Sequence, residues 1–146
     1  MKKSFAAAFR GIWMCIKTER NMKIHLLVFF YVIVVSVITK ITKTELFCVL
    51  LCSCAVFAAE MINTAIENMC DEIHPDYSKH IKKAKDISAG AVLVCAIISA
   101  VIGGCIFFTG SKINEVLAFA AAYPVIAALL LVPLPVCLYF IFRRKK

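Results

Sequence analysis

Four oxygen-bearing side chains recur along one apolar stretch at intervals that fit one face of a helix. They are Glu60, Asn63, Glu67 and Asp71. At 3.6 residues per turn they form a single stripe, about 16 Å long from its first to its last member. A carboxylate in a membrane-like setting is costly unless it is protonated or paired, so these residues are functional candidates. A buried structural hydrogen-bond network is the alternative interpretation.

The chemistry that these groups suggest is phosphoryl transfer from a nucleotide to an alcohol. Mg²⁺ is usually held by one or two carboxylates together with substrate phosphates. A base must also accept the proton of the attacking hydroxyl, and Glu60, the deepest carboxylate, is the candidate. Glu67 lies nearer the water and is a candidate metal ligand. Glu19 could close the same site from a neighbouring helix.

A second group of charged residues lies just before the apolar stretch of residues 87–108. Lys85 and Asp86 lie at this point, and a lysine supplies a suitable point charge for a phosphate. For Lys82 and Lys83, anchoring at the membrane surface is the simpler interpretation. Residues 104–112 contain glycines and a lysine, but their spacing is wrong for a phosphate-binding loop. We therefore expect a nucleotide site of another design.

The composition is that of a membrane protein. The 146 residues are 62% hydrophobic, with a mean hydropathy of +0.89, whereas soluble domains are roughly 45–50% apolar. A soluble fold of this size could not bury so much apolar surface, which excludes a soluble enzyme, a disordered tail and a collagen-like chain.

The net charge of +8 favours anionic lipid headgroups over nucleic acid as the binding partner of the basic residues. The eight cysteines show no zinc-site spacing.

We expect an all-α integral-membrane bundle that forms one domain, residues 1–146. Residues 1–23 place apolar side chains at spacings of three and four, which predicts an amphipathic surface helix. Glu19 falls near its apolar face, so either the helix ends before Glu19 or this carboxylate faces other protein. Three core transmembrane helices and a fourth, C-terminal one are predicted at residues 24–41, 46–69, 87–108 and 116–142.

The distribution of basic residues predicts the orientation of these crossings. With the N-terminus in the cytoplasm, all 17 Lys and Arg residues except Lys40, Lys43 and Lys112 lie inside. Positive charges concentrate in cytoplasmic loops, so this asymmetry supports an even number of crossings with both ends inside. The polar stripe then ends at the inner surface of the membrane.

Three segments of the chain resemble a known family. They are residues 19–25, residues 60–67 together with Asp71, and residues 82–92. Over about residues 5–108 the chain resembles the prokaryotic diacylglycerol kinase and undecaprenol kinase family of small integral-membrane lipid kinases, in particular its Gram-positive branch. The resemblance implies a homotrimer with active sites shared between subunits, and ATP with Mg²⁺ as the phosphoryl source. The stretch 116–142 departs from the family, which usually has three crossings.

The resemblance also implies roles for individual residues. Glu60 matches the family's general base, and Glu19 and Glu67 match its metal ligands. Glu19 and Glu67 also match residues around the nucleotide. The other positions that match such residues are Asn63, Asp71, Asp76, Tyr77, Lys85, Asp86 and, on the surface helix, Arg10.

We therefore expect an ATP- and Mg²⁺-dependent kinase that phosphorylates undecaprenol, in the bacterial cell membrane, with its active site on the cytoplasmic side. Diacylglycerol is the alternative substrate, because both lipids present a primary hydroxyl at the interface. A small proton-coupled transporter is an alternative of another class. Such a transporter would not need Glu19 and the Lys85–Asp86 pair, which cluster at the cytoplasmic end of the membrane helices. A non-catalytic scaffold would leave the polar stripe unexplained.

Overall fold

A computed structural model describes residues 2–73, 78–135 and 139. Within these ranges the regular structure is entirely helical. The helices are α1 (Lys2–Thr18), α2 (Arg20–Ile38), α3 (Lys43–Ile73), α4 (Lys79–Phe107), α5 (Gly110–Ala122) and α6 (Pro124–Leu131).

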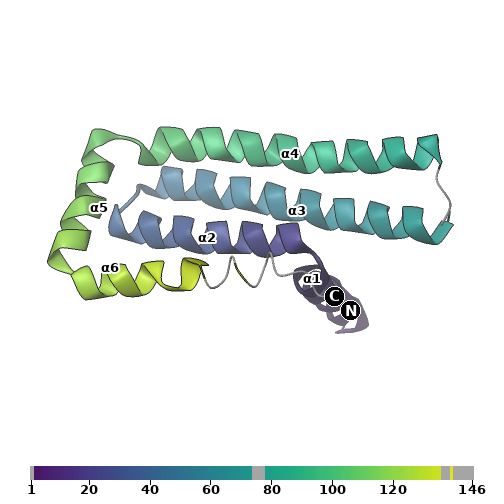
Figure 1. The fold of residues 1–146 in the computed structure, drawn as a ribbon, viewed down its shortest axis with the longest axis horizontal. Coiled ribbons are helices and arrows are strands. Elements are labelled where there is room, and N and C mark those ends of the chain that lie inside the picture. The colour runs from purple at the N-terminus through teal and green to yellow at the C-terminus, as the bar shows by residue number, and fades with distance from the viewer. Residues whose placement is uncertain (1, 74–77, 136–138, 140–146) are drawn as a thin grey trace.

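The centre of the molecule is a bundle of α2, α3 and α4, which lie side by side with their axes nearly aligned (Figure 1). Each is long and apolar enough to cross a membrane. Large apolar side chains remain exposed along all three, such as Val28, Leu51 and Val101. In water such a surface would be unstable, whereas lipid tails cover it at no cost. The predicted all-α membrane bundle is confirmed.

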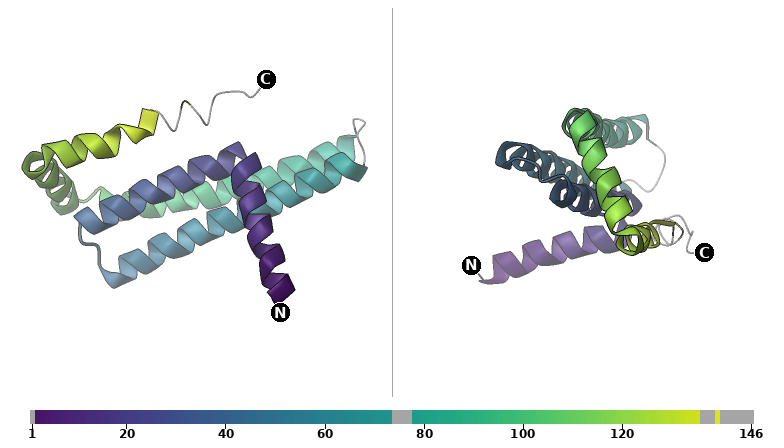
Figure 2. Two further views of the ribbon diagram at one scale, coloured as in Figure 1. Left: turned by 90° about the horizontal axis from the view of Figure 1, so that it is seen from below. Right: turned by 90° about the vertical axis from the view of Figure 1, so that its left-hand side faces the viewer.

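The predicted surface helix is shorter than residues 1–23. It ends at Thr18, and Glu19 takes an extended conformation (φ −85°, ψ 125°) before α2 begins at Arg20. The chain turns sharply there, so α1 projects away from the bundle (Figure 2). Phe9 and Trp13 on α1 are exposed rather than packed on the bundle, as expected of a helix lying in the membrane interface.

The bundle end remote from α1 is closed by two short-range motifs. After α2, Lys40 adopts φ 46°, and the amides of Lys40 and Ile41 donate to the carbonyls of Val37 and Ser36. This is a Schellman ending with lysine where glycine is usual. At the start of α3, Thr42 and Glu45 form a reciprocal capping box, with the Thr42 amide 2.8 Å from Glu45 Oε2.

The predicted crossing at residues 116–142 is not one straight helix in the part of it that the structure describes, but the bent pair α5 (Gly110–Ala122) and α6 (Pro124–Leu131). α5 and the helical segment after it meet at an angle of 106°. The break falls at Pro124, which lacks an amide proton and therefore suits the first position of a new helix. α5 runs across the end of the bundle, and α6 returns beside α2 (Figure 1), where Tyr31 Oη donates to the Leu130 carbonyl at 2.8 Å. Three helices, or four if the bent pair counts as one, could span the membrane.

Candidate active site

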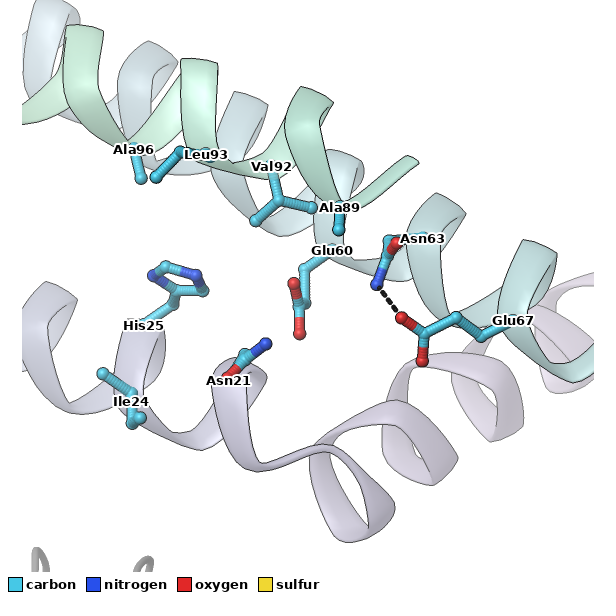
Figure 3. Close-up of a pocket in the computed structure, with 10 residues that line it drawn as sticks. All are labelled: Asn21, Ile24, His25, Glu60, Asn63, Glu67, Ala89, Val92, Leu93 and Ala96. Carbon is cyan, nitrogen blue, oxygen red and sulfur yellow. Dashed lines mark hydrogen bonds between the residues drawn. The ribbon is translucent and has the colours of Figure 1, made fainter. Parts of the chain in front are cut away.

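A cavity of about 300 Å³ opens between α2, α3 and α4 near the start of α2. One side is polar and the other apolar (Figure 3). The lining residues are Asn21, Ile24, His25, Glu60, Asn63, Glu67, Ala89, Val92, Leu93 and Ala96. Three members of the predicted stripe thus face one space, together with side chains from two other helices.

Glu60 is the most deeply buried side chain at this site, with 1% of its surface exposed. Its Oε2 atom has no hydrogen-bond partner within the described residues. The side chain of Asn21 lies next to it (Figure 3), and the charges of Glu19 and Glu67 act on it. Buried polar atoms are nearly always paired, so a buried unpaired oxygen calls for a specific reason, such as a catalytic role. Glu60 is available to a group that enters the cavity.

Asn63 joins α3 to the two neighbouring polar groups. Its Nδ2 donates to Glu67 Oε1 at 2.9 Å, and its Oδ1 accepts from Ser88 Oγ on α4 at 2.7 Å. The amide therefore holds the Glu67 carboxylate at the edge of the cavity.

Lys85 and Asp71 form an ion pair at the mouth of the site, with Nζ 2.5 Å from Oδ1. The pair joins the end of α3 to the beginning of α4, and both side chains remain partly exposed. A lysine held by a carboxylate at this place offers a positive charge to a phosphate without entering the apolar part of the cavity.

The end of α1 is attached to the site through a buried cysteine. Cys15 Sγ lies 3.5 Å from Thr64 Oγ1, which in turn donates to the Glu60 carbonyl at 2.9 Å. Burial raises the pKa of the Cys15 thiol, and the nearby carboxylates of Glu19 and Glu60 act in the same direction. Glu19 itself is half-buried at the α1–α2 break, where it accepts a hydrogen bond from Thr18 Oγ1.

Other predicted site residues lie away from the cavity or outside the described ranges. Arg10 is exposed on α1, and Asp86 is exposed on α4 without lining the cavity. Asp76 and Tyr77 lie outside the described residues. Within the described part of the chain, no three Asp, Glu, His or Cys side chains come together as a ready metal site. A metal ion would therefore need oxygen atoms from its substrate as well.

Sequence reasoning did not identify several residues at the site. Asn21 and His25 line the cavity, and Ser88 and Thr64 support it from behind. Asn21 and His25 were present in the quoted segment 19–25, and their placement one helical turn apart was the available signal. Ser88 and Thr64 carried no signal, because their role depends on which helices become neighbours.

Comparison with known proteins identifies the family to which the chain belongs. A family model for prokaryotic diacylglycerol kinase matches residues 6–107. The chain belongs to this family. The match spans α1 to α4 and with them the whole cavity, whereas α5 and α6 lie beyond it.

Two curated members of this lipid kinase family are clearly similar to the chain. Undecaprenol kinase of Bacillus subtilis is 39% identical over 105 residues, covering 72% of this chain and 85% of the relative. Diacylglycerol kinase of Synechocystis sp. is 35% identical over 104 residues, covering 70% of this chain and 59% of the relative. No solved structure matches the chain. The protein is a lipid kinase of the membrane-embedded type.

Proposed function

We propose that this lipid kinase transfers the γ-phosphoryl group of ATP to the hydroxyl of undecaprenol, with Mg²⁺ present, at the cytoplasmic side of the cell membrane. The observation that carries the proposal is the position of Glu60. Its buried, unpaired Oε2 faces a cavity that is polar toward the α1 break and apolar along α4. A lipid alcohol and a polar donor can meet only at such a boundary.

In this account Glu60 acts as the general base. The hydroxyl proton of the lipid passes to its carboxylate as the hydroxyl oxygen bonds to the γ-phosphorus. The bond from that phosphorus to the bridging oxygen then breaks, and ADP leaves with the bonding electrons. The apolar walls formed by Ile24, Val92 and Leu93 receive the first carbons of the lipid and exclude water.

The donors around the cavity fit a magnesium ion bound jointly with phosphate. Glu67 and Glu19 would hold it, since Mg²⁺ commonly takes one or two protein carboxylates and completes its shell with phosphate oxygens and water. When bound, the ion neutralises charge on the transferred phosphoryl group. Lys85, held at the mouth by Asp71, would attract the rest of the polyphosphate. Asp76, Tyr77, Asp86 and Arg10 are proposed around the nucleotide on family resemblance.

The cavity lining supports the proposal of undecaprenol over diacylglycerol. Diacylglycerol carries two ester carbonyls beside its hydroxyl, and buried carbonyls need hydrogen-bond donors. Beyond Glu60 toward the bundle interior, the lining offers His25 and otherwise Ile24, Val92, Leu93 and Ala96. A polyprenol has no polar atom besides its hydroxyl, so this lining suits it better. The named undecaprenol kinase relative agrees with this choice.

We also propose that the active form is a homotrimer with shared sites. The supporting observation is a stripe of small residues on α4, formed by Ala96, Ala100 and Gly104, with Ala100 exposed on the bundle surface. Small residues let membrane helices approach closely. Crosslinking of the purified protein should yield trimers, and a monomeric active enzyme would contradict this part of the proposal.

The test compares both lipids in one assay. Purified protein in detergent–lipid micelles receives ATP labelled in its γ-phosphate, with undecaprenol and diacylglycerol at equal mole fraction. We expect faster transfer of label to undecaprenol, and loss of transfer when magnesium is chelated. Faster labelling of diacylglycerol would reverse the substrate assignment, and transfer that survives chelation would contradict the metal requirement.

A further inference from the structure

Ser88 supports the active site from a position that no substrate can reach. It is 6% exposed, lies on α4 facing α3, and does not line the cavity. Its Oγ atom is 2.7 Å from Asn63 Oδ1 and 2.9 Å from the Lys85 carbonyl. Its hydroxyl therefore acts on the site only through neighbouring groups.

The hydroxyl of Ser88 carries one proton for these two acceptors. The Lys85 carbonyl lies within α4, where the helix backbone supplies its own N–H donors. Asn63 Oδ1 accepts a hydrogen bond from Ser88 alone among the described residues. Because Asn63 is 6% exposed, water is not a ready substitute. The hydrogen bond from Ser88 is thus needed to satisfy Asn63 Oδ1, whereas the Lys85 carbonyl has a backbone donor without it.

The Asn63 amide is held in one orientation between Glu67 and Ser88. In the observed orientation, Nδ2 faces the Glu67 carboxylate at 2.9 Å (Figure 3). The reversed amide would set its carbonyl against that carboxylate, and two acceptors repel each other. Glu67 therefore selects the amide orientation, and the Ser88 hydroxyl donates to Oδ1 and holds the amide in place. Only Oε1 of Glu67 takes part in this bond.

We propose that Ser88 is a positioning residue, which through the Asn63 amide holds Glu67 in the orientation needed to bind a divalent cation. The inference rests on the metal role proposed above for Glu67. Without the Ser88 hydroxyl, Asn63 Oδ1 loses its donor, the amide rotates more freely, and Glu67 is held less well. Groups that orient metal ligands commonly change metal affinity by about 10–100-fold when they are removed.

The chain offers a matched control in Ser99. This serine also lies on α4 and faces α3, where its Oγ donates to the Cys95 carbonyl at 2.7 Å and lies 3.5 Å from the Cys52 carbonyl. It does not line the cavity. Ser88→Ala and Ser99→Ala thus remove the same atom from the same helix interface, and Ser88→Thr restores the hydroxyl at the site.

The experiment measures cation binding without turnover. Mn²⁺ is titrated into each purified variant with a non-hydrolysable ATP analogue, and free Mn²⁺ is followed by electron paramagnetic resonance. A parallel assay measures the Mg²⁺ concentration for half-maximal kinase activity. We expect both constants to rise about tenfold in Ser88→Ala, to rise at least as much in Glu67→Gln, and to stay near wild type in Ser88→Thr and Ser99→Ala.

The outcomes separate this inference from the proposed function. If Glu67→Gln weakens Mn²⁺ binding and Ser88→Ala does not, the positioning role is wrong and the metal role of Glu67 stands. If neither variant changes Mn²⁺ binding, the metal role fails and the positioning role fails with it. Equal losses of thermal stability in Ser88→Ala and Ser99→Ala, without a change in cation affinity, would show that Ser88 only packs the helices together and would overturn the inference.

Discussion

At the scale of single residues, the site combines acidic groups that repel one another. Glu60 lies close enough to Glu19 and Glu67 for their charges to act on it, and neighbouring carboxylates disfavour one another's ionised form. In the proposed metal role of Glu19 and Glu67, a divalent cation bound with phosphate would relieve this repulsion.

The two proposed metal ligands can be tested by neutral substitution. Glu19→Gln and Glu67→Gln keep the side-chain size and remove the charge, so each should raise the Mg²⁺ requirement of the kinase about tenfold or more. The check is a magnesium titration of initial rates at saturating lipid. Glu72→Gln, an exposed position on the same helix as Glu67, is the control. An unchanged titration curve for both site variants would refute metal ligation.

Cys15 reports whether α1 stays attached to α3. Burial raises the pKa of its thiol above the ordinary value, so the reactive thiolate is scarce at neutral pH and increases only as the pH rises further. In a variant that keeps Cys15 alone, a maleimide should react slowly at pH 7 and faster at pH 9. A variant that keeps the less buried Cys70 alone is the comparison. Equal rates for both at pH 7 would contradict the docking of α1.

At the scale of elements, the far end of the bundle is linked to α5 by an ion pair between Lys112 and Glu45. Both side chains are largely shielded from solvent, and Glu45 also caps α3 through Thr42. The pair ties α5, which lies beyond the family match, to the three-helix bundle.

Removing one partner of this pair should destabilise the protein without affecting catalysis. Lys112→Met leaves the Glu45 charge without its partner, and we expect a measurable fall in the melting temperature. Thermal unfolding in detergent measures this fall, and the double variant Lys112→Met/Glu45→Gln should recover part of it. Kinase activity should be unchanged because the cavity lies at the other end of the bundle. A large fall in activity with unchanged unfolding would contradict this assignment.

The sequence predicted the surface helix and the three helices of the bundle, but not their ends. Long apolar runs identified α2, α3 and α4, and the spacing of Glu60, Asn63 and Glu67 predicted that these three side chains share one face. The break at Glu19 could only be stated as one of two possibilities, because helical periodicity continues across it. Pro124 marked an interruption of the last apolar stretch, but the sequence did not give the size of the bend, because prolines in membrane helices can either kink or end them.

At the scale of the whole molecule, the two ends of the bundle differ in character. The site end carries the Lys85–Asp71 pair and the end of α1, whereas the far end is closed by the α2–α3 turn and by α5 (Figure 1). In the proposed orientation the site end faces the cytoplasm, because positive charges concentrate on that side of a membrane.

This orientation predicts which positions an impermeant reagent reaches from outside the cell. In a variant without its eight native cysteines, Thr44→Cys at the far end should be labelled in intact cells. His80→Cys at the site end should be labelled only after the membrane is opened. Both positions are exposed in the structure, so burial does not explain a difference. Labelling of His80→Cys in intact cells would reverse the proposed orientation.

The most direct test of the account is the effect of Glu60→Gln on the separate steps of the reaction. Glutamine keeps the shape of the side chain but cannot accept the proton of the lipid hydroxyl. We predict that ATP with Mg²⁺ still binds, as measured by calorimetry, while phosphoryl transfer to undecaprenol falls about 10²–10⁴-fold. Glu72→Gln should retain full activity. Transfer at the wild-type rate by a folded Glu60→Gln variant would contradict the central claim that this buried carboxylate is the base.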